Sequence, residues 1–292
     1  MSGAATVEPR YGCQNMTSRL RSVLVRAPDA AACARWKDFG WRGAPDPVQL
    51  QREHEQLTAL LESRGAVAVF GDAVHDGLDA IYTFDPALVS RRGAIILRFG
   101  KELRQPEGPA TVKDMIRFGV PVVATLAAPA TAEGGDLLWL DENTVLVGRG
   151  YRTNALGVDA LQKALPDVEF IEFDLPHFHG PAEVLHLLSL INLVAPDLAV
   201  TYTPLLPVRL VQLLREREIR LVEVPDDEFE TMGPNVLALE PGVVVALRRN
   251  RETRRRLERK GVDVLTYDGT ELSKGDGGPT CLTLPLLRVS VS

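Results

Sequence analysis

Apolar residues recur along this chain with two alternating spacings. Segments in which they stand three and four residues apart predict helices, and each is followed by a short apolar run that predicts a strand. This helix-then-strand pattern occurs five times, at 47–70, 109–125, 154–174, 207–225 and 250–268. A glycine or a polar residue lies between helix and strand, as expected where a helix ends.

Pairs of strand-like runs precede several of these helices. In 136–148 and 235–247 a short polar turn divides two apolar runs, which predicts antiparallel neighbours. The chain therefore contains five predicted β-β-α-β units with a period of roughly 45–55 residues, the pattern of a repeat architecture. Five similar units favour a closed ring, because a radial arrangement removes exposed end repeats. The final run, 281–289, would then be the strand that closes the fifth unit.

We therefore predict an α/β fold, a five-bladed β/α propeller with pseudo-five-fold ββαβ repeats, in a single domain that spans residues 1–292. A doubly wound α/β sheet is the alternative, because strands and helices alternate there too. Two features argue against it. The paired strands with short turns indicate antiparallel neighbours, and no glycine-rich phosphate loop follows the first predicted strand.

Composition and charge narrow the classes of function. The chain is 45% hydrophobic and 25% charged, which is ordinary for a globular protein with a core, and its net charge is −6. An acidic balance argues against binding nucleic acid or an anionic membrane, both of which need a basic surface. The basic stretch 248–261 is interrupted by Glu252 and Glu258, and we interpret it as the solvated face of a helix.

The N-terminus and the cysteines bear on the cellular compartment. The first residues lack the basic-then-apolar pattern of a signal peptide, and no apolar run approaches the roughly 18 residues that a membrane span needs. We therefore expect a cytoplasmic protein. The three cysteines, Cys13, Cys33 and Cys281, have no short pairwise spacing and predict free thiols rather than disulfides or a zinc site.

Polar residues interrupt the apolar strands, and in a ring of repeats the starts of the strands converge on a central channel. Cys281, after a Gly-Gly-Pro-Thr turn, could be a nucleophile if a neighbouring cation or histidine lowers the pKa of its thiol. His186 could donate a proton to a leaving amine and then activate water, and Glu133 could orient that histidine. Each also has a structural interpretation: a lone histidine in an apolar run is usually a core residue, and Glu133-Gly-Gly-Asp136 is a plausible turn.

The same set contains groups suited to a cationic substrate. Asp85 could hold a planar guanidinium, which is always charged and pairs bidentately with carboxylates. Asp79 lies beside the same predicted strand. Arg104 and Arg152 would then be free to bind a carboxylate at the far end of the substrate.

A metal site has weak support in the sequence. His177 and His179 have a spacing that a metal could use, but the nearest further ligands are Asp174 and Glu183, in a predicted loop. We therefore expect neither a metal nor a cofactor.

In chain order, the motifs Glu133-Gly-Gly-Asp136, Arg152-Thr-Asn154, His186-Leu-Leu and Gly-Pro-Thr-Cys281 resemble those of the guanidino-group-modifying enzymes. This superfamily consists of five-bladed α/β propellers called penteins, and the sequence is most similar to dimethylarginine dimethylaminohydrolase (DDAH). The resemblance runs from about residue 76 to the C-terminus. It is specific as an ordered set, although no single motif is.

The resemblance implies a role for each matching position. Cys281 would be the nucleophile that forms an S-alkylthiouronium intermediate, His186 the general acid and base, and Glu133 the carboxylate beside that histidine. The remaining positions would bind substrate, its guanidinium at Asp85 with Asp79 as the earlier acid of the strand, and its carboxylate at Arg104 and Arg152.

Two positions depart from the family patterns. Arginine deiminases and amidinotransferases carry His-x-Asp where this chain has Leu188, which argues against arginine deimination and amidino transfer. DDAH enzymes carry Glu-Asp where this chain has Phe84-Asp85, which argues against methylated arginine itself as the substrate. The stretch 28–46, with Trp36 and Trp41, is either a lid that reshapes the pocket or a loop that its tryptophans anchor.

The sequence thus predicts a cysteine-dependent hydrolase of the guanidino group of arginine or an N-substituted arginine, which yields a citrulline-type product and an amine or ammonia. Its partner would be a small-molecule guanidino substrate, and a homo-oligomer is compatible with the sequence. Two alternatives stay open: an amidinotransferase with the same covalent intermediate, and a non-catalytic pentein that acts by binding, as the ribosome anti-association factor does. The presence of Cys281, His186 and Glu133 together argues against the second.

Overall fold

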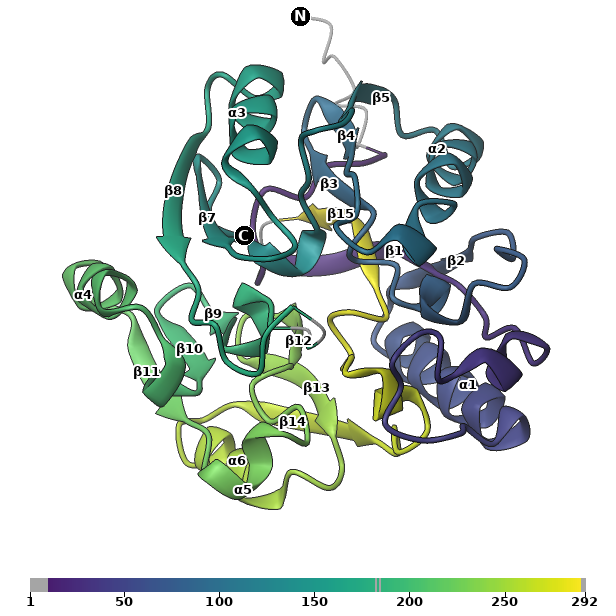
Figure 1. Cartoon of the computed structure of the whole chain (residues 1–292). Coiled ribbons are helices and arrows are strands. Elements are labelled where there is room, and N and C mark those ends of the chain that lie inside the picture. The colour runs from purple at the N-terminus through teal and green to yellow at the C-terminus, as the bar shows by residue number, and fades with distance from the viewer. Residues whose placement is uncertain (1–9, 182, 184, 290–292) are drawn as a thin grey trace, which may run out of the picture.

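Five three-stranded sheets make up the framework of the molecule (Figure 1). The computed structural model describes residues 10–181, 183 and 185–289. In four of the sheets, two antiparallel strands are followed by a helix and then by a third strand that is parallel to its neighbour. This is the β-β-α-β unit that the sequence pattern predicts.

These four units follow one another along the chain. The first contains β3 (Ala87–Ser90), β4 (Gly93–Ile96), α2 (Glu107–Arg117) and β5 (Val122–Thr125). The second contains β6 (Leu137–Asp141), β7 (Thr144–Arg149), α3 (Ala155–Ala164) and β8 (Glu169–Asp174). The third contains β9 (Ile191–Ala195), β10 (Leu198–Thr201), α4 (Val208–Glu216) and β11 (Arg220–Glu223). After the short helix α5 (Asp226–Phe229), the fourth contains β12 (Leu237–Glu240), β13 (Val243–Leu247), α6 (Arg251–Glu258) and β14 (Asp263–Tyr267).

The fifth sheet brings together strands from the two ends of the chain. β1 (Arg19–Val25) pairs in parallel with β2 (Val67–Phe70), which follows α1 (Pro47–Ser63). On its other side β1 pairs antiparallel with β15 (Leu284–Val289). Figure 1 shows purple β1 beside yellow β15. The C-terminal strand therefore completes a unit whose other elements come from the N-terminal region.

Two local predictions are wrong. Asp79 and Asp85 do not flank a strand. Asp79 belongs to a 3₁₀ turn, η2 (Leu78–Ile81), whose backbone is bonded in tight turns, Ala80 N–H to Gly77 O and Tyr82 N–H to Asp79 O. The last strand begins at Leu284 and not at residue 281, because the N–H of Leu282 bonds back to Gly278. The candidate residues in these segments consequently lie on turns that precede strands.

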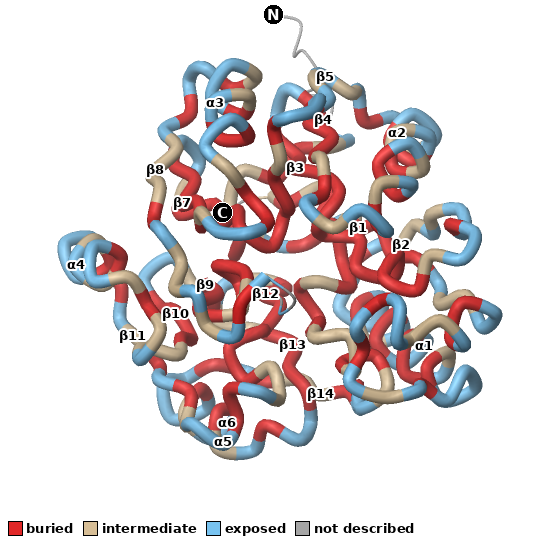
Figure 2. The backbone as a smooth tube through the Cα atoms, viewed as in Figure 1, coloured by how far each residue is buried: buried red, intermediate tan, exposed pale blue. Residues whose placement is uncertain are grey.

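Buried residues concentrate on the strands, and exposed residues lie on the outer faces of the helices (Figure 2). All residues of β3 and β4 are buried, whereas β5 at the edge of that sheet is partly exposed. In α6, Thr253 and Leu257 are buried, and its exposed arginines pair with Glu252 and Glu258. The interpretation of this basic stretch as a solvated face is confirmed. Within the described residues, no helix combines the length and the apolar character that crossing a membrane requires.

A buried ion pair joins the sheet of β1 to the neighbouring unit. Arg26, which follows β1, donates from Nη2 to Asp114 Oδ2 of α2 at 2.6 Å, and the two side chains are 2% and 0% exposed. Arg26 Nη1 also donates to the carbonyl of Ala80 at 3.1 Å, and Asp114 Oδ1 accepts the N–H of Asp72 at 3.1 Å. Because both charges are out of water, each stabilises the fold only while the other is present.

Asp114→Ala should therefore lower the free energy of unfolding by about 3–5 kcal/mol, because it leaves the Arg26 charge buried and unpaired. Urea unfolding followed by circular dichroism measures this change. Asp72→Ala is the matched control, since it removes a carboxylate that pairs with Arg117 at the exposed surface and should change stability little. Equal unfolding midpoints for the two variants would contradict the assignment.

Candidate active site

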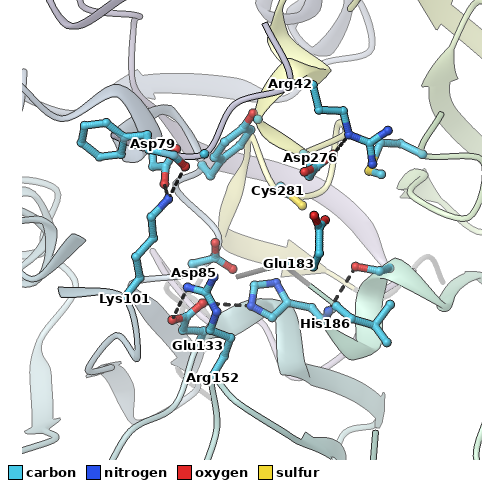
Figure 3. Close-up of a pocket in the computed structure, with 18 of the residues that line it drawn as sticks. Arg42, Asp79, Asp85, Lys101, Glu133, Arg152, Glu183, His186, Asp276 and Cys281 are labelled. Carbon is cyan, nitrogen blue, oxygen red and sulfur yellow. Dashed lines mark hydrogen bonds and ion pairs between the residues drawn. The ribbon is translucent and has the colours of Figure 1, made fainter. Parts of the chain in front are cut away.

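A cavity of about 530 Å³ brings together the residues that the sequence predicts for a reaction site (Figure 3). They lie on turns that precede strands or helices of different units, so segments far apart in the sequence converge here. Their roles stay predictions, but their shared location is a property of the fold. The predicted residues that line the cavity are Asp79, Asp85, Arg104, Glu133, Arg152, His186 and Cys281.

The acid and the histidine are in direct contact. His186 Nε2 and Glu133 Oε2 are 2.9 Å apart, and both side chains are buried. Glu133 Oε1 accepts the N–H of Gly100 at 2.9 Å and lies 3.6 Å from Arg152 Nη1. Gly135 is required beside them, because a Cβ there would lie 2.2 Å from His186 Nδ1. The Gly-Gly pair of the motif therefore makes room for the imidazole.

The electrostatic surroundings keep this pair ionised. Burial alone would raise the pKa of Glu133, but the hydrogen bond and charge of His186, with the charge of Arg152, lower it to about 2. Burial would lower the pKa of His186, but the Asp136 charge, the Glu133 hydrogen bond and the charge of Asp85 raise it to about 9. At neutral pH the histidine is thus an imidazolium that can donate a proton.

Asp136 has a role that the sequence did not assign to it. Its Oδ1 accepts the N–H of Leu187 at 3.1 Å, and its Oδ2 accepts the Thr153 hydroxyl at 2.7 Å. It thereby holds the 3₁₀ turn η5 (Leu187–Ser189), which begins directly after His186. Burial raises the pKa of Asp136 to about 6, against the opposing charge of His186. Its position in the Glu-Gly-Gly-Asp motif could have indicated this role from the sequence.

Arg104 differs from the prediction of a free cation. Its Nη1 donates to Asp85 Oδ2 at 2.6 Å, and its Nε and Nη2 donate to the two oxygens of Glu107 at 2.8 Å each. Arg104 is buried between these two carboxylates because an unpaired guanidinium out of water would be costly. Asp85 Oδ1 accepts the N–H of Gly135 at 2.9 Å. Glu107 was not among the predicted site residues, although its spacing of three residues from Arg104 is typical of an ion pair on a helix.

Asp79 connects the cavity to the segment 28–46. Trp41 Nε1 donates to Asp79 Oδ1 at 2.7 Å, and Lys101 Nζ donates to Asp79 Oδ2 at 2.6 Å. Lys101 also donates to the carbonyl of Phe39 at 2.6 Å. Trp41 is therefore an anchor, and the residues around it, 37–40 and Arg42, form one wall of the cavity. Lys101 was not among the predicted site residues.

Cys281 is half-buried on the turn before β15 and lines the cavity. Its Sγ accepts a hydrogen bond from Asn235 Nδ2 at 3.2 Å. Burial and the negative charge of Asp85 raise the pKa of the Cys281 thiol to about 11. The thiol is thus protonated at neutral pH while the cavity contains no additional positive charge.

The two departures from the family patterns do not face the cavity. Phe84 and Leu188 are buried in the hydrophobic core, and neither belongs to the cavity lining. Phe84 therefore supplies no carboxylate to the cavity, and the argument against methylated arginine as the substrate stays a prediction.

Metal-ligating residue types form one close group in the described part of the chain. The donor atoms of Asp85, Glu133 and His186 lie within 4.8 Å of one another. Hydrogen bonds within the site explain this proximity, since His186 is bonded to Glu133 and Asp85 to Arg104. Among the described residues, the weaker candidate around His177 does not form such a group, and its Nδ1 is 2.6 Å from the hydroxyl of Tyr151.

Solved structures of other proteins show the same fold as this chain. DDAH of Pseudomonas aeruginosa, as a cysteine-to-serine mutant complexed with citrulline, matches with a TM-score of 0.77 and 22% identity over 91% of this chain and 99% of that one. The N-terminal domain of ArgZ, a cyanobacterial arginine dihydrolase, covalently bound to a reaction intermediate, matches with a TM-score of 0.79 and 19% identity over 91% and 98%. This chain therefore has the α/β fold of these two proteins.

Sequence comparison gives a second, independent similarity. A model of the arginine deiminase family matches residues 195–288. The arginine deiminase of Rhodococcus erythropolis is 32% identical over 75% of this chain and 62% of its own length, so the chain spans less than two thirds of that enzyme. Protein YkgA of Bacillus subtilis is 29% identical over 81% of this chain and 79% of its own length. The resemblance seen in the motifs is confirmed: the chain is similar in sequence to arginine deiminases and in fold to DDAH and ArgZ.

Glu133→Gln should lower the pKa of His186 from about 9 towards its ordinary value. The substitution keeps the shape of the side chain but removes a negative charge, so the imidazole should lose its proton at a pH about one unit lower or more. Titration of the histidine rings by NMR measures this. His54, whose pKa burial lowers to about 4, is the internal reference and should not change. Titration of His186 at the same pH in both proteins would contradict the ion pair.

Proposed function

We propose that this protein is a cysteine-dependent hydrolase of the guanidino group of arginine or an N-substituted arginine. One observation carries the proposal: a single cavity contains the Cys281 thiol, the His186 imidazole hydrogen-bonded to Glu133, and the carboxylate of Asp85. A nucleophile, a proton donor and an anionic binding group are the three parts that such a reaction needs. The sequence similarity to arginine deiminases supports the same class of substrate.

Binding of a guanidinium would itself activate the thiol. Burial and the Asp85 carboxylate raise the pKa of Cys281 to about 11. A cation placed beside Asp85 would offset the negative charge of that carboxylate and so lower the pKa of the thiol. The thiolate would thus form mainly in the substrate complex. Substrate cation and catalytic thiolate then stabilise each other, and the empty site keeps an unreactive thiol.

Two steps would complete the reaction. The Cys281 thiolate attacks the central carbon of the guanidinium, the bond from that carbon to the leaving amine breaks, and His186 gives its proton to the amine. Neutral His186 then takes a proton from water, the resulting hydroxide attacks the same carbon, and the C–S bond breaks. As the C–S bond breaks, the second proton of that water goes to solvent. The neutral ureido product then leaves, Cys281 is a thiolate again, and His186 carries the first proton. Glu133 would stabilise the imidazolium of His186 before the first step and again after the second.

Amidino transfer is the second candidate, because the amidinotransferase SxtG of Microseira wollei also has this fold, with a TM-score of 0.76 over 97% of this chain. That reaction would share the first step, and an amine instead of water would resolve the adduct.

We further propose that the five sheets are the blades of a closed ring in one domain, with β15 as the closing strand. Its support is the pairing of β15 with β1. The cytoplasmic location stays a prediction from the sequence.

Exposure to a panel of arginine, N-methylated arginines, agmatine and guanidino acids tests the proposed function. Samples quenched in acid should contain an ureido product and an adduct that mass spectrometry maps to Cys281. Cys281→Ser should reduce turnover by about a thousandfold or more, because the nucleophile is lost. Cys33→Ser is the matched control and should keep full activity, since Cys33 is buried outside the cavity lining.

Hydrolysis of every active substrate by Cys281→Ser at the native rate would refute the covalent mechanism. Adding primary amines to the same reactions separates the two candidates. An amidino group found on the added amine would identify a transferase, and only ureido product would identify a hydrolase.

A further inference from the structure

We propose that Asn235 is a positioning residue for Cys281, which holds the sulfur in place and stabilises its thiolate. Asn235 Nδ2 donates to Cys281 Sγ at 3.2 Å, and Asn235 is 2% exposed. It lies shortly before β12, 46 residues from the cysteine that it contacts. The contact is a direct observation, whereas its consequence for turnover rests on the function proposed above.

The orientation of the Asn235 amide is fixed. Its Oδ1 accepts the backbone N–H of Thr280 at 3.1 Å, directly before the cysteine in the chain. The opposite orientation would place an N–H donor against the Thr280 N–H donor and an oxygen against the sulfur. Gly278 packs so closely that a Cβ there would lie 2.5 Å from Asn235 Oδ1. The amide therefore directs its donor to Cys281.

A second asparagine, Asn192, binds the backbone next to Asn235. Asn192 of β9, which is 1% exposed, donates from Nδ2 to the carbonyl of Pro234 at 3.0 Å and to that of Leu188 at 2.8 Å. Leu188 belongs to the turn η5 that begins after His186. The backbone next to Asn235 is thus tied to the backbone next to the proton donor, which fixes the thiol and the imidazole in one framework.

The Asn235 amide opposes the effects that disfavour the Cys281 thiolate. Burial and the charge of Asp85 raise the pKa of Cys281, whereas the Gly278 backbone, the Asn235 amide and the charge of Arg104 lower it. A hydrogen bond to an anionic acceptor is stronger than one to a neutral acceptor, so Asn235 stabilises the thiolate more than the thiol. Because an amide carries no charge, it does so without repelling a cationic substrate.

Two substitutions test this role. Asn235→Ala removes the donor, and Asn235→Asp keeps the shape but replaces the donor with a carboxylate. The rate at which iodoacetamide alkylates Cys281, followed by peptide mass spectrometry as a function of pH, reports the pKa of the thiol. Asn235→Ala should move this profile to higher pH, and Asn235→Asp should move it further. For a substrate identified as above, kcat should fall about tenfold to a hundredfold with KM nearly unchanged.

Asn250→Ala is the matched control. Asn250 is also 2% exposed and makes two side-chain hydrogen bonds to Thr231, from Nδ2 at 2.9 Å and to Oδ1 at 2.6 Å. Its described contacts do not include the sulfur, so its loss should lower thermal stability and leave the alkylation profile unchanged. A purely structural role of Asn235 would give this same result. Native alkylation profiles and native kcat in both Asn235 variants would overturn the proposal.

A measurement on the native protein covers the case in which the variants do not fold. The side-chain amide resonance of Asn235 should shift as Cys281 titrates and should shift again when Cys281 is alkylated; no change in either experiment would overturn the proposal.

The two proposals can fail separately. A shifted alkylation profile without turnover of any guanidino compound would refute only the function. Turnover that requires Cys281 but is insensitive to Asn235 would refute only the positioning role.

Discussion

The site depends on the hydrogen bond between Glu133 and His186. Both side chains lie almost wholly out of water, where an unpaired charge is costly, so each is stable as an ion only because the other is present. Gly135 provides the space for the imidazole, and Asp136 holds the backbone that follows it. The pair therefore fixes the position of the histidine and also its protonated state.

The same constraint organises the rest of the cavity. Lys101 is paired with Asp79, and Arg104 with Asp85, so these cations already meet carboxylates before any ligand enters. Such a network is oriented in advance and does not have to reorganise when charge develops in a reaction. The Cys281 thiol is held differently, by a neutral amide, and burial together with the charge of Asp85 raises its pKa to about 11.

The repeated units make this convergence possible. The candidate side chains lie on turns directly before a strand or, for Arg104 and Arg152, before a helix. The rigid strands and helices that follow therefore help to fix their positions. The exception is the segment 28–46, which is not part of a sheet. It is fixed instead by Trp41, whose indole binds Asp79 inside the molecule.

The sequence by itself determined most of the helices and strands and the seven candidate side chains that the cavity brings together. Burial repeats along a helix or a strand with a local period, and the ordered motifs mark the turns. Only the tertiary structure decided the partners, because long-range contacts depend on which segments the fold brings together. Arg104 was expected to be free and proved to be enclosed by carboxylates. The bonds of Trp41 to Asp79, 38 residues apart, and of Asn235 to Cys281, 46 residues apart, leave no periodic signal in the chain.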